Sequence, residues 1–275
     1  MGMQTRDRDS RTLDRMGSRL HYRLEGPPTG PLVALTHGVM LDRRTFAPQI
    51  PALVTAGYRV LTWDIRGHGL SQPQGAELTI EVVAEDLLAV LDDLDAGQAA
   101  LVGQSFGGMV VQRLLADHPE RVSAAVMIGT PALGDRPGPV MRVLQRLRIP
   151  FARVWPYPSI RSMFVTMVTK QPQVRRYVDE ASAIPSKGTF LAVSQAAMDG
   201  YLGDADAPTH GVPVLLAQGE REERGVARAL RAWAEHEPTA RHAVIPDAGH
   251  LVNMDNPAGF NDALTGFLAE HALTP

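Results

Sequence analysis

Short apolar runs alternate with segments of helical period along most of the chain, and this alternation limits the possible folds more than any other feature. The runs with the length and composition of strands buried on both faces are residues 31–38, 58–64, 99–104 and 121–129. The segments between them, with apolar residues every three or four positions, are residues 46–58, 80–94 and 106–119. Strands alternating with such helices predict a mostly parallel, doubly wound α/β sheet with right-handed crossovers. Before them, residues 18–26 alternate polar and apolar side chains as an edge strand does.

The alternation stops near residue 131 and resumes with a strand at 212–219. Between these points the chain has clustered prolines and stretches of helical period such as 140–149 and 160–170. Structureless loops of this length are rare inside compact domains, so we expect a helical insertion. The predicted organisation is a flexible polar leader at 1–16, one core domain made of 17–130 and 208–275, and a helical cap at 131–207.

Composition excludes several classes of function. A formal net charge of -3 gives no electrostatic reason to expect a nucleic acid or an anionic membrane as partner. The N-terminal residues are charged and lack the apolar core of a signal peptide, and no apolar run reaches the length of a membrane span. We therefore expect a cytoplasmic protein, as a monomer or homodimer, whose partner is a small-molecule substrate.

Cofactor and metal signals are also missing from the sequence. The chain has no cysteine, which excludes a thiolate nucleophile and a cysteine-bound metal. The histidines are scattered without the paired spacing of metal ligands. No G-x-G-x-x-G motif follows the first buried run, so a dinucleotide site is unsupported. We expect no cofactor and no metal.

The pentapeptide GQSFG at residues 103–107 lies between an apolar run and a helical segment. In a G-x-S-x-G motif placed there, a sharp turn exposes the serine hydroxyl, and the glycines let strand and helix approach closely. Ser105 is therefore the candidate nucleophile. The N–H of Phe106 would lie at the start of the helix, where unpaired donors favour negative charge.

A serine hydroxyl needs a base to take its proton, and His250 has the best position for that role. It follows the last predicted strand and precedes the last helix, on a loop at the carboxyl edge of the sheet. The other downstream candidates, which lie within a predicted strand, in connections or on helix surfaces, are His210, His236, His242 and His271.

The third member of such a site should be a carboxylate between the serine and the histidine in chain order. The strand at 212–219 runs into the stretch AQGEREER at residues 217–224, which offers Glu220, Glu222 and Glu223. The spacing of the residues alone does not show which of the three glutamates would contact the histidine.

Five motifs together resemble the α/β-hydrolase family, from about residue 17 to the end of the chain. They are THG at 36–38, DIRGHGLS at 64–71, GQSFGG at 103–108, QGEREE at 218–223 and DAGH at 247–250. The resemblance implies a sheet of about eight strands with a helical cap inserted after the sixth. It also implies that the acid lies at the position of Glu222, where relatives more often have aspartate. Glu223 and Asp135 are the alternates.

The same resemblance implies an oxyanion hole made of the backbone N–H groups of Val39 and Phe106, with Met40 as the alternate donor. It gives His37 the role of organising this loop. The residues expected to line the substrate pocket are His37, Met40, Trp155, Met163, Met167 and Leu251. The methionine and aromatic residues of the insertion predict a largely apolar pocket for a small to medium substrate.

We therefore expect a serine hydrolase that cleaves a carboxylic ester or lactone through an acyl-serine intermediate. Carbon-carbon bond hydrolases and cofactor-free perhydrolases, also called haloperoxidases, share this set of residues and remain alternatives. Epoxide hydrolases and dehalogenases of the family use an aspartate nucleophile, so Ser105 argues against both. A non-catalytic protein that binds a small ligand on the same fold is the alternative from another class.

Overall fold

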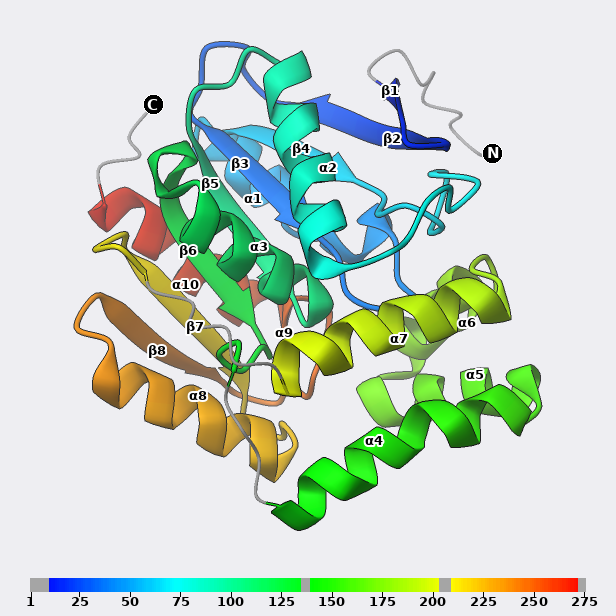
Figure 1. Cartoon of the computed structure of the whole chain (residues 1–275). Coiled ribbons are helices and arrows are strands. Elements are labelled where there is room, and N and C mark those ends of the chain that lie inside the picture. The colour runs from blue at the N-terminus through cyan, green and yellow to red at the C-terminus, as the bar shows by residue number, and fades with distance from the viewer. Residues whose placement is uncertain (1–9, 135–138, 203–208, 272–275) are drawn as a thin grey trace.

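The computed structural model describes residues 10–134, 139–202 and 209–271 and contains one sheet of eight strands (Figure 1). The strands are β1 (Ser10–Arg15), β2 (Ser18–Glu25), β3 (Leu32–Thr36), β4 (Arg59–Trp63), β5 (Ala99–Gln104), β6 (Val122–Ile128), β7 (Val214–Gly219) and β8 (Ala240–Ile245). Their order in the sheet is β1-β2-β4-β3-β5-β6-β7-β8. The pairs β1–β2 and β2–β4 are antiparallel and all other pairs are parallel. The predicted fold class is confirmed.

Alternate side chains of the central strands enter two separate apolar cores. In β3, Leu32 and Ala34 pack into one core, and Val33 and Leu35 pack into the other. The strand period of two sends neighbouring residues to opposite faces, and both faces of a parallel sheet are covered by helices. This is why the central strands are continuous apolar runs.

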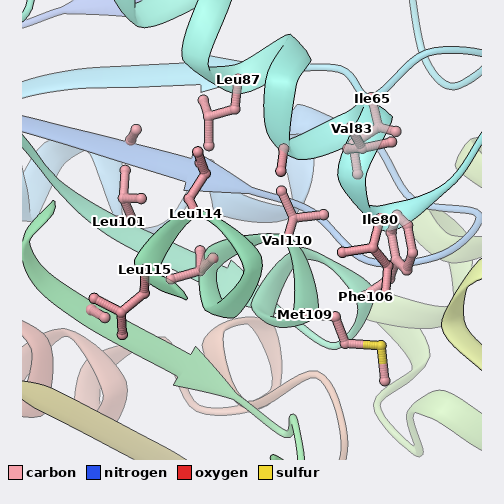
Figure 2. Close-up of a cluster of buried hydrophobic side chains, with 14 of the residues drawn as sticks. Ile65, Ile80, Val83, Leu87, Leu101, Phe106, Met109, Val110, Leu114 and Leu115 are labelled. Atoms are coloured by element: carbon pink, nitrogen blue, oxygen red, sulfur yellow. The ribbon is translucent and has the colours of Figure 1, made fainter. Parts of the chain in front are cut away.

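The first core lies under α2 (Ile80–Asp93), α3 (Phe106–Asp117) and α8 (Arg224–His236). Figure 2 shows the part of it where Val83 and Leu87 of α2 face Val110 and Leu114 of α3. The second core lies under α1 (Ile50–Thr55), α9 (Val252–Asp255) and α10 (Pro257–Glu270). These two helical layers hold the strand ends in fixed positions.

The order of the central strands reverses at β3. The chain leaves β3 toward β4 on one side and later returns to β5 on the other side of β3. Ligands of open α/β sheets bind where the strand order reverses in this way. Thr36 at the end of β3 pairs with Gly103 in β5. The loop after β3 and the turn after β5 therefore start side by side.

Helices α4 (Pro139–Val154), α5 (Tyr157–Val168), α6 (Pro172–Ser182) and α7 (Lys187–Leu202) lie between β6 and β7 in the chain. We call them the helical insertion. Figure 1 shows them gathered beyond the carboxyl ends of the parallel strands. The insertion follows β6 in the chain, and its helices span residues 139–202. No helix in the part of the chain that the structure describes is long and apolar enough to cross a membrane.

Two features of the N-terminal part differ from the sequence prediction. Ser10–Arg15, within the expected flexible leader, forms β1, and β1 rather than β2 is the edge strand. Few side chains of β1 are apolar, so hydrophobic periodicity does not reveal it. Backbone pairing with β2 and an ion pair from Arg15 to the buried Asp86 at 3.0 Å hold it in place. The short elements η1 (Arg43–Phe46), η2 (Pro119–Arg121) and α9 also lack a periodic signal.

Candidate active site

Ser105 occupies a strained turn between β5 and α3. Its φ of 53° and ψ of -115° lie outside the regions that a serine readily adopts. The Ser105 N–H donates to the Ile128 carbonyl at 2.9 Å, which ties the turn to the end of β6. A Cβ at Gly107 would overlap the Thr36 carbonyl oxygen, and one at Gly103 would overlap backbone atoms of Gly107. The two glycines thus permit the close approach that the motif predicts.

The loop after β3 passes directly beside this turn. A Cβ at Gly38 would lie 3.2 Å from the Ser105 Cβ, so the Gly38 backbone borders the serine. Val39 is half-buried, and Met40 is fully buried with a φ of 58°. The N–H of Phe106 belongs to the first turn of α3, whose N–H groups have no acceptor within the helix.

His37 is buried behind the loop, and the hydrogen bonds of its ring define its tautomer. Its Nε2 accepts from the Ile65 N–H at 2.9 Å, and its Nδ1 lies 2.8 Å from the Gly38 carbonyl. The proton must therefore be on Nδ1, which donates to Gly38. Burial lowers the pKa of His37, which keeps the ring neutral. The contacts of His37 are those of a loop organiser, and the ring faces backbone groups.

His250 and Glu222 form a hydrogen-bonded pair at the carboxyl edge of the sheet. The His250 Nδ1 lies 3.1 Å from Oε1 and 3.2 Å from Oε2 of Glu222. The Glu222 side chain is 2% exposed and that of His250 is 25% exposed. The Glu222 Oε1 also accepts from the Glu223 N–H at 3.0 Å. The carboxylate is thus nearly buried and held by two hydrogen-bond donors, while the His250 side chain keeps some access to solvent.

Gly129 connects this pair to the serine turn. It follows Ile128, the acceptor of the Ser105 N–H, and has a φ of 58°. A Cβ there would lie 2.9 Å from Glu222 Oε2 and 3.1 Å from His250 Nδ1. Gln104, next to Ser105, donates from Nε2 to the His250 carbonyl at 3.4 Å. Ser105 follows β5, Gly129 follows β6, Glu222 follows β7 and His250 follows β8, and these four strands are adjacent in the sheet.

The charges around His250 favour its protonated form. Burial by itself lowers the pKa of His250, but the Glu222 carboxylate and its hydrogen bond raise it, as does the more distant Asp255. The net effect is a pKa above the ordinary histidine value. An imidazole in this environment accepts a proton readily, and the imidazolium that results is stabilised by Glu222.

The three glutamates of the stretch AQGEREER have three different partners. The Glu220 Oε2 accepts from the Asp247 N–H at 3.0 Å, so Glu220 holds the loop after β8. Glu222 contacts His250. Glu223 caps α8, where its Oε2 accepts from the N–H groups of Gly225 at 2.9 Å and Val226 at 3.2 Å. Among these glutamates the structure brings only Glu222 to the imidazole, and the alternate Asp135 lies outside the described residues.

A family model described as alpha/beta hydrolase fold matches residues 31–257. The chain belongs to the alpha/beta hydrolase fold family. Bifunctional epoxide hydrolase 2 of Sus scrofa is 37% identical over 123 residues, which are 44% of this chain and 22% of that protein. Epoxide hydrolase A of Mycobacterium tuberculosis is 39% identical over 125 residues, 45% of this chain and 39% of that protein. The chain thus spans well under half the length of these curated relatives.

A solved structure gives a longer match. The crystal structure of a hydrolase from Pseudomonas aeruginosa aligns with a TM-score of 0.81 and 27% sequence identity. The alignment covers 95% of this chain and 99% of that chain. The alpha/beta hydrolase fold therefore extends over nearly the whole chain, including the helical insertion.

The residues expected to line the pocket of this alpha/beta hydrolase divide into two groups. His37, Met40 and Leu251 are fully buried, and Leu251 packs in a small apolar core between the insertion and the sheet edge. Trp155, Met163 and Met167 are between 45% and 59% exposed on the insertion. The Trp155 ring stacks on the Phe151 ring, with centroids 4.8 Å apart. Three of the six residues are thus buried beside the sheet edge, and three are exposed on the insertion.

Two residues near the site were not identified from the sequence. One is Gly129, which has no side chain to mark it. The other is Asp255, whose Oδ2 accepts from the Gly249 N–H at 2.9 Å, directly before His250. An acidic residue five positions after His250 is the only sequence signal for it. The described residues contain no cluster of three or more His, Asp or Glu side chains that could hold a metal ion.

Proposed function

We propose that this alpha/beta hydrolase is a serine hydrolase that cleaves a carboxylic ester or a lactone. The observation that carries the proposal is the His250–Glu222 pair beside the strained turn of Ser105. A serine, a carboxylate and an imidazole in this chain order form the charge arrangement that activates a serine hydroxyl. The imidazole side chain is 25% exposed, while the Glu222 side chain is nearly fully buried.

In the proposed mechanism, Ser105 Oγ attacks the carbonyl carbon while His250 Nε2 takes the hydroxyl proton. Glu222 holds the Nδ1–H and stabilises the imidazolium. The carbonyl oxygen becomes negative and accepts hydrogen bonds from the N–H groups of Val39 and Phe106. Collapse of this intermediate breaks the bond to the alcohol oxygen, which receives the proton from His250. The acyl group is then bound to Ser105 as an ester.

Water completes the reaction by the same steps in reverse. His250 removes a proton from water, the hydroxide attacks the acyl carbon, and Ser105 leaves with the proton returned by His250. An ester yields an acid and an alcohol, whereas a lactone yields one hydroxy acid. No redox partner or cofactor is needed.

Epoxide hydrolysis, the activity in the names of the two curated relatives described above, is chemically less suited to this site. A carboxylate that opens an epoxide forms an ester, which water can cleave. A serine oxygen that opens an epoxide forms an ether, and an imidazole-activated water does not cleave an ether. Ser105 at the nucleophile position therefore supports acyl chemistry.

A pre-steady-state assay with p-nitrophenyl butyrate tests the proposal. We expect a burst of about one p-nitrophenol per protein molecule, because the acyl-serine forms before water releases it. The Ser105→Ala variant should show no burst. Steady turnover of styrene oxide without ester turnover would contradict the proposal. Peroxide-dependent halogenation and cleavage of a β-diketone, measured on the same preparation, test the perhydrolase and carbon-carbon hydrolase alternatives.

A further inference from the structure

Helices α5 and α6 of the insertion contact both loops of the proposed site. Val168 at the end of α5 and Val174 and Val178 in α6 share a small apolar core with Leu41 and Leu251. Leu41 lies two residues after the proposed oxyanion donor Val39, and Leu251 follows His250 directly. The rest of the insertion packs elsewhere, because α7 contacts α4, α2 and α3.

A chain of hydrogen bonds leads from the α5–α6 corner to His250. The Thr169 Oγ1, directly after α5, donates to Asp255 Oδ1 at 2.5 Å. The other oxygen of Asp255 accepts from the Gly249 N–H at 2.9 Å. The corner itself is held by the Arg175 Nε, which donates to the Thr169 carbonyl at 3.1 Å. Thr169 is thus linked, through the carboxylate of Asp255, to the backbone directly before His250.

A second contact leads from α6 to the loop after β3. The Tyr177 hydroxyl donates to the Asp42 carbonyl at 3.0 Å and accepts from the Asp42 N–H at 3.2 Å. The guanidinium of Arg44 lies over the Tyr177 ring, 5.4 Å from its centroid. Asp42 follows Leu41, so this contact fixes the far end of the loop that begins at His37.

We propose that α5 and α6 form a brace that sets the position of His250 relative to the oxyanion loop, with Thr169 and Tyr177 as positioning residues. The inference rests on the proposed function, since it concerns the same site. Because of the brace, activity depends on the position of the insertion relative to the carboxyl edge of the sheet. A shift of about 1 Å in a catalytic group is enough to lower a rate by about 100-fold.

Matched substitutions of two threonines near the end of α5 test the brace. Thr169→Val removes the hydroxyl that reaches Asp255, and Thr169→Ser keeps it. Thr166→Val is the control, because the Thr166 hydroxyl donates only to carbonyls of its own helix. We expect Thr169→Val to slow fluorophosphonate labelling of Ser105 about tenfold. Thr169→Ser and Thr166→Val should label at the wild-type rate.

Nitrogen NMR of the His250 ring provides a readout that does not depend on turnover. The charged groups that act on this ring are Glu222 and Asp255. We expect Asp255→Asn to lower the pH at which the ring titrates, because a negative charge is lost. Thr169→Val should shift the ring resonances, and Thr166→Val should leave them unchanged. Thr169→Val with wild-type resonances and labelling would overturn the brace.

Tyr177→Phe tests the contact to the oxyanion loop. We expect it to lower kcat about tenfold with KM nearly unchanged, because the oxyanion donors act mainly in the transition state. A wild-type kcat for Tyr177→Phe would overturn this half of the brace. Failure of the wild-type protein to label at all would instead contradict the proposed function, and the His250 resonances would still decide whether the brace exists.

Discussion

The imidazole of His250 lies 3.1 Å from the carboxylate of Glu222, and the Glu222 side chain is 2% exposed. Glu223, the next residue, points its carboxylate to the start of α8. Two adjacent acids of the same type thus have separate roles, one facing the site and one capping a helix. This separation allows the site and the fold to be tested with matched substitutions.

Glu222→Gln should lower kcat for an ester by about 1,000-fold or more, because an amide neither fixes the tautomer of His250 nor stabilises the imidazolium. Glu223→Gln is the matched control and should keep kcat within about twofold. Removing the cap with Glu223→Ala should lower the free energy of unfolding by about 1 kcal/mol. Steady-state kinetics and urea unfolding measure the two effects, and equal loss of kcat in both glutamine variants would contradict the assignment.

The rate of ester hydrolysis should rise with pH, with a midpoint above the ordinary histidine value of about 6.5. Glu222 raises the pKa of His250 despite its burial, and only the neutral ring can act as base. Below the midpoint the ring is protonated and cannot act as a base. The raised pKa therefore moves the acid limb, the part of the pH–rate profile where the rate rises, to higher pH. His37 cannot produce this limb, because burial lowers its pKa. A kcat/KM profile with a midpoint at or below about 6.5 would contradict this account.

Gly107→Ala should destabilise the protein by about 1–3 kcal/mol and slow the reaction, because the added Cβ overlaps the Thr36 carbonyl. The overlap can be relieved only by moving the serine turn away from the loop after β3. Gly97→Ala is the control, since a Cβ there has nothing within 4 Å. Urea unfolding followed by tryptophan fluorescence compares the two, and equal stability would show that the close approach is absent.

Asp86→Asn should lower the free energy of unfolding by about 3–5 kcal/mol, because it leaves the Arg66 charge buried without a charged partner. The Asp86 carboxylate binds Arg66 at 2.6 and 2.7 Å, and both side chains are fully buried. Asp117→Asn, in an exposed pair with Arg113, is the control and should cost less than about 1 kcal/mol. If the two variants unfold at the same urea concentration, the buried pair is not a major source of stability.

The parts of this fold that the sequence predicts are those encoded by local patterns. The buried strands appear as apolar runs, and the turn at Ser105 appears as glycines between a strand and a helix. His250 and Glu222 could be proposed because each follows a recognisable strand. The sequence of the loop at 217–224 does not show which glutamate contacts His250. The path of the loop decides this, because it places Glu223 at the start of α8, where its side chain caps the helix.

The features that the sequence does not predict depend on distant contacts. Thr169 and Asp255 are 86 residues apart, and each alone is an ordinary polar residue. The strand β1 is polar, and besides its pairing with β2 it is held by the ion pair of Arg15 with Asp86, 71 residues away. The expected pocket residues were chosen by residue type, and type does not show which face of the insertion meets the substrate. Leu251 and Met163 accordingly differ in exposure from 0% to 59%.

The most direct test of the central claim is fluorophosphonate labelling measured by intact mass, with the adduct located by peptide mapping. We predict one adduct, on Ser105, forming much faster in the wild-type protein than in His250→Ala or Glu222→Gln. No adduct, an adduct on another residue, or the same rate in all three proteins would contradict the claim that Ser105, His250 and Glu222 act together.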